Sequence, residues 1–311
     1  MKDPYEKIIA EFEQDCKIQG MTKESIRGYI SNNRTFARFL KERGVLFENI
    51  TKDDVVDFIV YLQEERHSKP ATLEQYLSGM NSLYDFLIFK ERITTNFIPA
   101  LRKRYLKRIK KIAANGSRRK VIAQENMAQY LNSIINPRDK AIATLFVKTG
   151  IRRGELISID LEDIDWKVNS ITLKEKRKRT NTVVFFDSEC ARVLKYWIRM
   201  REEFSVPDGS NALFIGQGGR RLKRQGVYRA ITDWARKDGI HNENAEDISE
   251  HFSPHNLRHC FTTYLLEGGM PREYVQELRG DARTDAVDLY NHIPKENLRE
   301  AYLAAMPVFG L

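Results

Sequence analysis

Cysteine is scarce in this chain of 311 residues, which has only Cys16, Cys190 and Cys260, far apart from one another. No two of them form a Cys-x-x-Cys pair, so the sequence predicts neither a disulfide framework nor a zinc ribbon. We interpret all three as reduced cysteines with a structural role.

Long apolar runs are absent as well. No run approaches the roughly 20 residues that a membrane-spanning helix needs. The N-terminal residues Met1–Glu6 lack the apolar segment of a secretory signal. The sequence has no Gly-rich phosphate loop and no Asp, Glu or His cluster with the spacing of metal ligands. We therefore expect a cytoplasmic protein with no membrane partner, no bound metal and no other cofactor.

Acidic residues are outnumbered, because 52 Lys and Arg stand against 43 Asp and Glu, which gives a net charge of +9. Residues 101–120 include ten Lys or Arg and no acid, and two further basic clusters lie at 174–179 and 220–224. One such run is most often a solvated surface. Three in one chain favour a nucleic-acid partner, because each phosphate contact releases counterions and adds affinity.

The first hundred residues have the spacing of helices. Thr51–Asp54 has the pattern of a capping box, and apolar residues recur every three or four positions over Leu73–Leu87. The basic stretch that follows has the composition of a linker. We predict a helical domain at residues 1–100, a basic interdomain linker at 101–118 and a second domain at 119–311.

The second domain is predicted to begin with a helix at residues 138–149. Three short segments rich in β-branched and aromatic residues follow at 163–166, 170–174 and 182–186, and they predict a small antiparallel sheet. The remaining helices are predicted at 188–204, 223–237, 254–266, 271–278, 284–290 and 295–305. The expected fold class is therefore mainly α with one small antiparallel β-sheet, in two domains.

Five residues of the second domain suit phosphoryl transfer: Arg152, Lys176, His255, Arg258 and Tyr290. Arginine presents a planar fork to phosphate oxygens and stabilises the charge of a transition state. Lysine can donate a proton to a leaving alkoxide, and tyrosine can act as a covalent nucleophile. His255 and Arg258 are three residues apart, so they share one face of a helix. Composition alone does not assemble these residues into one site.

Several sequence boxes resemble those of the tyrosine recombinases. Thr149–Leu156 resembles the family's T-G-x-R-x-x-E-L box, and Ser253–Phe261 resembles its S-P-H-x-L-R-H-x-F box. Gly280-Asp281 and Leu289–Ile293 resemble its L-G-H…Y-T-H-V box. The order Arg, Lys, His-x-x-Arg, Tyr is kept along the chain, and the match is most similar to the Xer-type branch.

The resemblance implies a helical core-binding domain and a mixed α/β catalytic domain of a site-specific recombinase that acts on double-stranded DNA. Tyr290 would attack a phosphodiester and form a 3′-phosphotyrosine, while Arg152 and Arg258 hold the non-bridging oxygens. Lys176 would protonate the leaving 5′-oxygen, and His255 would assist proton transfer. A homo-tetramer on DNA, assembled from monomers or dimers, is implied because exchange between two duplexes requires four active sites.

Two positions leave alternatives open. The family's hairpin aligns its catalytic lysine with Lys176, and Lys174 is the second choice. Asp281 occupies the position where the family usually has His or Trp, and an ionised carboxylate accepts hydrogen bonds only and repels phosphate. Three interpretations compete: Asp281 is turned away and replaced by Arg279 or Arg283, it is neutralised by a proton or an arginine, or the chain cleaves DNA slowly.

Two other functions are compatible with the same residues. One is a type IB topoisomerase-like enzyme, which the chain length and the Xer-like boxes argue against. The other is a DNA-binding relative with weak or no activity, of which Asp281 would be the first sign. Among recombinases, the chain is either an integrase or excisionase of a mobile element or a Xer-type resolvase of chromosome dimers. Asp281 slightly favours the mobile element.

Within the C-terminal helix predicted at 295–305, residues 296–305 have Leu298, Tyr302 and Leu303 on one side. This helix resembles the family's tail, which docks on a neighbouring subunit. Packing of the helix on its own domain is the alternative.

Overall fold

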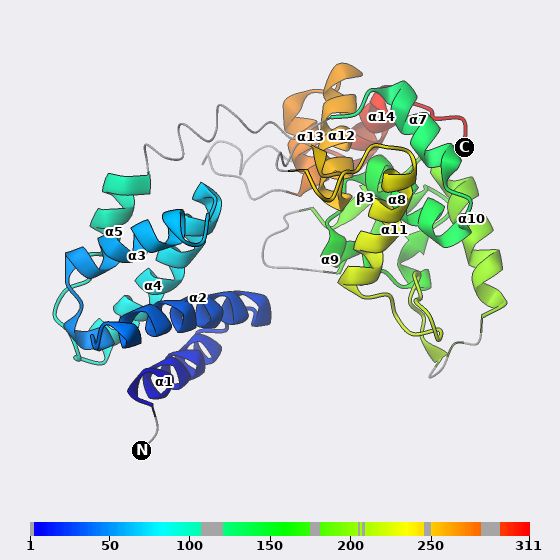
Figure 1. Ribbon diagram of the computed structural model, residues 1–311. Helices are drawn as coiled ribbons and strands as arrows, with labels where there is room; N and C mark the ends of the chain where they lie inside the picture. Colours follow the sequence, from blue (N-terminus) through cyan, green and yellow to red (C-terminus); the bar gives the residue numbers. More distant parts are fainter. Residues whose placement is uncertain are drawn as a thin grey trace. The chain divides into compact units, whose positions relative to one another are not determined.

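A computed structural model describes residues 3–106, 121–174, 181–204, 206, 209–245, 250–280 and 293–311. The chain divides into two compact units, Met1–Arg118 and Arg119–Leu311 (Figure 1). Each unit has its own hydrophobic core. Within these described ranges, no helix combines the length and the apolar character that crossing a membrane requires.

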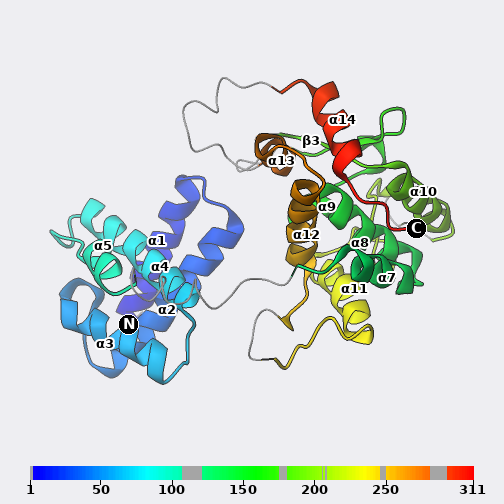
Figure 2. The ribbon, with the colours of Figure 1, turned by 90° about the horizontal axis from the view of Figure 1, so that it is seen from above.

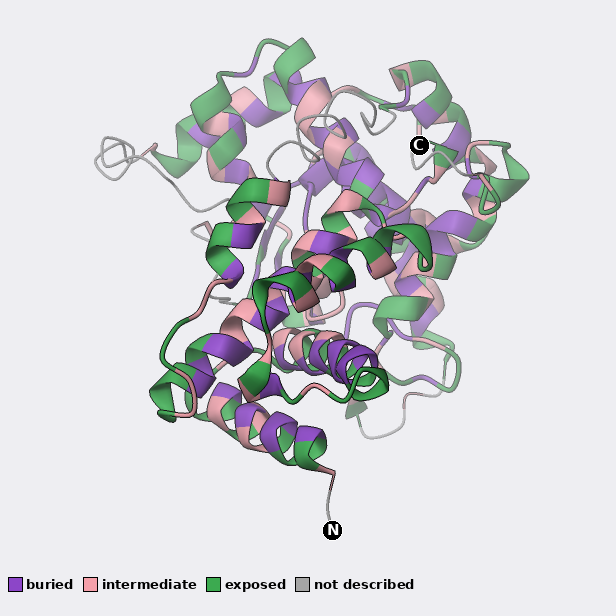
Figure 3. Ribbon diagram, turned by 60° about the vertical axis from the view of Figure 1, so that its left-hand side comes forward, coloured by how far each residue is buried: buried purple, intermediate pink, exposed green. Residues whose placement is uncertain are grey.

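The described part of the first unit is helical. Its elements are α1 (Pro4–Ile18), α2 (Lys23–Glu42), η1 (Phe47–Asn49), α3 (Lys52–Glu64), α4 (Pro70–Phe89), α5 (Ile98–Leu101) and η2 (Arg102–Leu106). Buried residues recur along one side of these helices and exposed residues along the other (Figure 3). Tyr84 is among the buried residues, and its hydroxyl donates a hydrogen bond to the carbonyl of Phe47 over 2.9 Å.

Two predictions for this unit, the capping box at the start of α3 and the boundary at residue 100, have different outcomes. The capping box is confirmed, because Thr51 and Asp54 exchange hydrogen bonds at the start of α3. The boundary at residue 100 is too early. Leu101 and Leu106 are buried in the core of the first unit, so the helical structure continues six residues into the predicted linker. The charges of this segment suggested a linker, but its apolar residues pack as a helix.

The second unit is also mainly helical. Its elements are α7 (Gln124–Ser133), α8 (Pro137–Thr149), α9 (Arg153–Leu156), η3 (Leu161–Asp163), β1 (Ile164–Asp165), β2 (Ser170–Thr172), β3 (Val183–Phe185), α10 (Ser188–Glu202), α11 (Arg224–Lys237), α12 (Pro254–Glu267), α13 (Arg272–Arg279) and α14 (Lys295–Ala305). The helix predicted at 284–290 lies outside the described residues.

The described strands of the second unit form one antiparallel sheet in the order β1-β2-β3. Ile171 pairs with Ile164 on one side and with Val184 on the other. All three side chains are buried, because β-branched residues pack well on the covered face of a sheet. The predicted fold class, mainly α with a small antiparallel sheet, is confirmed.

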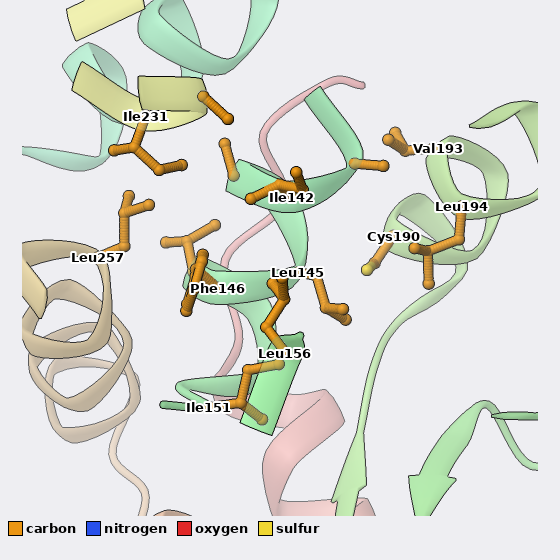
Figure 4. Packing of buried hydrophobic residues seen from close by; sticks show 14 of the residues in the cluster. Ile142, Leu145, Phe146, Ile151, Leu156, Cys190, Val193, Leu194, Ile231 and Leu257 are labelled. Atoms are coloured by element: carbon orange, nitrogen blue, oxygen red, sulfur yellow. The ribbon is translucent and has the colours of Figure 1, made fainter. Parts of the chain in front are cut away.

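Helix α8 lies at the centre of the second unit, between α10 on one side and α11 and α12 on the other (Figure 2). Figure 4 shows Ile142, Leu145 and Phe146 of α8 among side chains from those three neighbours. Every residue from 141 to 150 is buried. The C-terminal half of α8 is thus covered on all sides, and its end leads directly into the candidate site.

Helix α14 packs on its own unit. Leu298 and Tyr302 are buried in a cluster with Phe261 and Leu265 of α12. The hydroxyl of Tyr302 donates a hydrogen bond to the carbonyl of Lys148 over 2.9 Å. In this structure Leu298 and Tyr302 therefore follow the alternative, in which the helix packs on its own domain. Leu303, the third residue of the predicted apolar side, is 40% exposed, and docking on a neighbouring subunit stays a prediction.

The residues after α14, 306–311, form a tail that is held by a buried ion cluster. The Lys148 side chain is fully buried, and its ammonium donates to Asp187 (2.6 Å), to Glu189 (2.7 Å) and to the carbonyl of Pro307 (2.7 Å). The Glu189 carboxylate also accepts from two backbone amides of the tail, those of Phe309 and Leu311. All three ammonium hydrogens of Lys148 are thus satisfied inside the protein.

Candidate active site

Arg152 is placed by the end of α8. Gly150 follows the last helical residue and has a positive φ of 59°, which ends the helix and turns the chain. A Cβ atom at this position would lie 2.3 Å from the ring of Phe261, so glycine is also needed for the close approach of α8 to α12. Ile151 is buried, and this anchors the chain just before Arg152.

Glu155 holds Arg152 in place. Its carboxylate accepts a hydrogen bond from the backbone amide of Arg152 (2.7 Å) and pairs with the guanidinium (3.1 Å). The Glu155 side chain is 3% exposed, whereas that of Arg152 is 36% exposed. The acid is therefore a buried support, and the arginine remains accessible from solvent.

His255 and Arg258 lie in the first turns of α12, which begins at Pro254. His255 is exposed and Arg258 is 5% exposed. The Arg258 guanidinium donates to the carbonyl of Gly150 and, over 3.0 Å, to the carbonyl of Arg279. These carbonyls lie at the C-terminal ends of α8 and α13, where the helix dipole favours a cation. Arg258 thus links three helices at the site.

A cavity of about 460 Å³ lies where these elements meet. It is lined by Ile151, Arg152, Arg153, Gly154, Arg224, Tyr228, Ser253, Pro254, His255 and Arg258. The structure therefore brings Arg152, His255 and Arg258 to one cavity, although Arg152 comes from a different part of the sequence. The concentration of arginine makes this cavity suited to an anion such as a phosphodiester.

Two of the lining residues, Arg224 and Tyr228, were not predicted for the site. They are four residues apart on α11 and so lie on the same face of that helix. The sequence marked Arg224 only as part of a basic cluster. The spacing shows which residues share a face but not that this face meets α9 and α12.

Three predicted site residues lie outside the described residues. Lys176 falls in 175–180, and both Asp281 and Tyr290 fall in 281–292. The alternative lysine, Lys174, is described: its side chain is half-exposed and its ammonium is paired with the carboxylate of Asp160. In the described part of the chain, no group of His, Cys, Asp and Glu has the arrangement of a metal site.

Comparison with known protein families identifies the family of this chain. A model described as "Phage integrase family" matches residues 120–297, which is more than half of the chain. A second, "Phage integrase, N-terminal SAM-like domain", matches residues 8–92. The chain belongs to the phage integrase family. The matched range includes the end of α8, α9, α11 and α12, which are the elements that line the cavity.

Curated relatives of this family member are Xer-type tyrosine recombinases. "Tyrosine recombinase XerD" of Oceanobacillus iheyensis is 26% identical over 310 residues, which cover 97% of this chain and 99% of the relative. "Tyrosine recombinase XerC" of Vibrio parahaemolyticus is 27% identical over 296 residues, which cover 93% and 89%. The prediction of a tyrosine recombinase of the Xer-like branch, a DNA strand transferase, is confirmed.

Solved structures agree on the fold. The Tn1549 transposon integrase in complex with transposon right end DNA has a TM-score of 0.71 at 16% identity and covers 94% of this chain and 97% of its own. The XerH site-specific recombinase bound to a palindromic difH substrate has a TM-score of 0.63 at 19% identity and covers 94% and 83%. Both likenesses extend over most of this chain, including both units.

Proposed function

We propose that this recombinase cleaves and rejoins double-stranded DNA at a specific recombination site through a 3′-phosphotyrosine at Tyr290. The observation that carries the proposal is the cavity in which Arg152, His255 and Arg258 meet. Two guanidinium groups on one phosphate can neutralise its charge and stabilise the pentacovalent transition state. Arg258 is held by backbone carbonyls, so its position does not depend on the DNA.

The reaction conserves bonds at each step. The phenol oxygen of Tyr290 attacks phosphorus, the bond from phosphorus to the 5′-oxygen breaks, and Lys176 supplies the proton that this oxygen takes up. His255 assists the loss of the phenol proton. The 5′-hydroxyl of a partner strand then attacks the phosphotyrosine, and Tyr290 leaves and regains a proton. One ester replaces another, so no external energy source is consumed.

The assembly in this proposal is a homo-tetramer on DNA. Exchange between two duplexes breaks four strands, and each active site provides one nucleophile. A cytoplasmic location, where chromosomal and plasmid DNA are accessible, is part of the same proposal. The task is either integration and excision of a mobile element or resolution of chromosome dimers. A direct repeat beside the gene identifies the former.

The test is capture of the covalent adduct. Fragmented genomic DNA from the strain that carries the gene is incubated with the protein and quenched with SDS, and the protein-bound DNA is sequenced. A nicked suicide duplex of the captured sequence then measures the cleavage rate. We expect one enriched site and an SDS-stable adduct that Tyr290→Phe abolishes. Tyr196→Phe, an exposed position on α10, is the matched control.

Two results would contradict the proposal. The first is the absence of any wild-type adduct above the Tyr290→Phe background, which would leave a DNA-binding protein without cleavage. The second is an adduct that persists in Tyr290→Phe and disappears in Tyr228→Phe, because Tyr228 also lines the cavity.

A further inference from the structure

Asp160 binds two cations from distant parts of the second unit. Its carboxylate pairs with the ammonium of Lys174, at the end of the β2 segment, and with the guanidinium of Arg221, just before α11. Asp160 is 8% exposed. Burial raises the pKa of Asp160, but the hydrogen bonds from Lys174 and Arg221 outweigh this effect and hold the pKa below its ordinary value. The carboxylate is therefore charged at neutral pH.

Arg221 extends this cluster toward the segment that bears Arg152. Besides Asp160, its guanidinium donates to the carbonyls of Ile157 (2.9 Å) and Ile159 (3.3 Å), which directly follow α9. One arginine thus joins the chain after α9 to the chain before α11. Both of these helices line the candidate active site.

The backbone of Asp160 is itself fixed. Its amide donates to the Asp163 carboxylate over 2.7 Å, and the residue forms an antiparallel bridge with Ala212. The neighbouring amide of Leu161 donates to the carbonyl of Asn211 over 2.8 Å. A carboxylate on such a fixed backbone is a firm attachment point for the more exposed Lys174.

Lys174 is the last described residue before residues 175–180, which include Lys176. Strands β2 and β3 pair up to Thr172 and Val183, and the amide of Leu173 still donates to the carbonyl of Thr182 over 2.6 Å. Lys176 follows two residues after Lys174 in the sequence. The attachment of Lys174 to Asp160 therefore lies at the point where the chain leaves the sheet toward Lys176.

We propose that Asp160 is a positioning residue for DNA cleavage, which acts by binding Lys174 and thereby directs the following segment so that Lys176 reaches the leaving 5′-oxygen. Lys174 is in this view the anchor and not the general acid. Donation of its proton would leave a neutral amine beside the Asp160 carboxylate and remove a charge-assisted hydrogen bond. The inference rests on the proposed function, in which Lys176 protonates the leaving group.

The first experiment compares two leaving groups on the captured duplex: the ordinary 5′-oxygen and a 5′-bridging sulfur. A thiolate leaves without being protonated, so general acid catalysis no longer contributes. We expect Lys176→Ala to slow cleavage about 100-fold or more on oxygen DNA, the usual size of a general-acid effect, and to recover on sulfur DNA. Asp160→Asn and Lys174→Met should lose about tenfold on oxygen DNA through misplacement of the acid and should also recover on sulfur DNA.

Conservative substitutions at Lys174 and Lys176 distinguish the lysine that binds Asp160 from the lysine that protonates the leaving group. Lys174→Arg keeps a cation for Asp160, so we expect cleavage within about threefold of wild type, whereas Lys176→Arg loses the donor and should be slow, because arginine does not give up its proton. The matched control is Asp165→Asn, on β1, whose carboxylate accepts only from the backbone amides of Lys167 and Val168 among the described contacts. It should cleave both substrates like wild type.

The second measurement requires no DNA. Trypsin cuts after Lys and Arg, and residues 176–179 offer four consecutive sites. If Asp160 anchors this segment, Asp160→Asn and Lys174→Met should be cut there about tenfold faster than wild type and Asp165→Asn, because cleavage follows the population of the released form. Lys174 is 49% exposed, so Lys174→Met tests the anchor without disturbing the core.

The outcomes distinguish the two proposals. If Lys176→Ala fails to recover on the sulfur substrate, the role of Lys176 in the proposed function is wrong. If Lys176→Ala recovers while Asp160→Asn and Lys174→Met do not, the positioning inference alone is wrong. Unchanged tryptic cleavage in both anchor variants refutes the inference even if no cleavable DNA site is found. Slow cleavage by Lys174→Arg that recovers on sulfur would make Lys174 the general acid and also overturn it.

Discussion

Replacement of Lys148 by methionine tests whether the buried ion cluster holds the second unit together. Methionine is similar in length and apolar, so it fills the space but removes the ammonium. Glu189, with a side chain that is 3% exposed, and Asp187, with one that is 13% exposed, then lose their common cation. The carbonyl of Pro307 loses its donor too.

The expected loss is large. Removal of one partner from a buried ion pair costs about 3–5 kcal/mol, because the remaining charge stays buried without compensation. A domain has a total stability of roughly 5–15 kcal/mol, so the variant should lose a large part of it. The double variant Lys148→Met, Glu189→Gln leaves no unpaired carboxylate at position 189. It should therefore be less destabilised than the sum of the two single variants.

The effect should also depend on pH. Burial raises the pKa of Glu189, but hydrogen bonds from Lys148 and from two tail amides outweigh it, and the pKa lies below its ordinary value of 4.5. A depressed carboxyl pKa contributes stability above the unfolded value, and this is lost as the pH falls from about 4.5 through the folded pKa. In Lys148→Met burial dominates, so the carboxyl takes up a proton more readily. The stability difference between wild type and variant should be greatest at neutral pH and shrink on acidification.

The assay is urea unfolding followed by tryptophan fluorescence. All three tryptophans, Trp166, Trp197 and Trp234, belong to the second unit, so the signal reports this unit alone. Lys140→Met, on the same helix but partly exposed, is the matched control and should change stability by less than about 0.5 kcal/mol. A Lys148→Met protein within about 1 kcal/mol of wild type at pH 7, with the same difference at pH 4.5, would refute the reasoning.

Two further substitutions test the supports of the active site. Gly150→Ala places a methyl group against Phe261 and also strains the backbone at a positive φ, so it should destabilise the second unit by about 2–4 kcal/mol. The control, Gly218→Ala, has a φ of 78° but open space around it and should cost about 1 kcal/mol. Equal losses of stability in urea unfolding would rule out the steric argument. Glu155→Gln removes the charge that holds Arg152 and should slow suicide-substrate cleavage by about 10- to 100-fold. The affinity for DNA in a filter-binding assay should change by less than about twofold. A parallel loss of affinity would show that Glu155 supports DNA binding and not the chemical step.

The sequence predicted the elements well because their signals are local. The periodicity of apolar residues over Leu73–Leu87 and the capping box at Thr51 depend on neighbours a few positions away, and α4 and α3 appear there. The linker boundary failed for a related reason. Charge dominates the composition of residues 101–106, yet two leucines decide the packing of this segment.

The parts that could not be predicted depend on contacts between distant residues. Lys148 stands in an apolar helix, and its sequence neighbours do not reveal that Asp187, Glu189 and the tail surround its ammonium. Arg224 looked like one cation in a basic cluster until the packing of α11 placed it at the cavity. The motif boxes, by contrast, indicated that Arg152, His255 and Arg258 belong to one site. Resemblance to a family implies which distant residues meet in the fold, and the spacing of residues in one sequence does not.

The burial of residues 141–150, at the C-terminal end of α8, has a consequence for how long the site keeps its shape. Amide hydrogens in a helical segment that is covered on all sides exchange with solvent only when the surrounding structure opens, so those of residues 141–149 should be among the slowest in the second unit. The carbonyl of Gly150, which binds Arg258, belongs to the end of this helix. The setting of that arginine therefore persists for as long as the second unit stays folded, through many rounds of DNA binding and release.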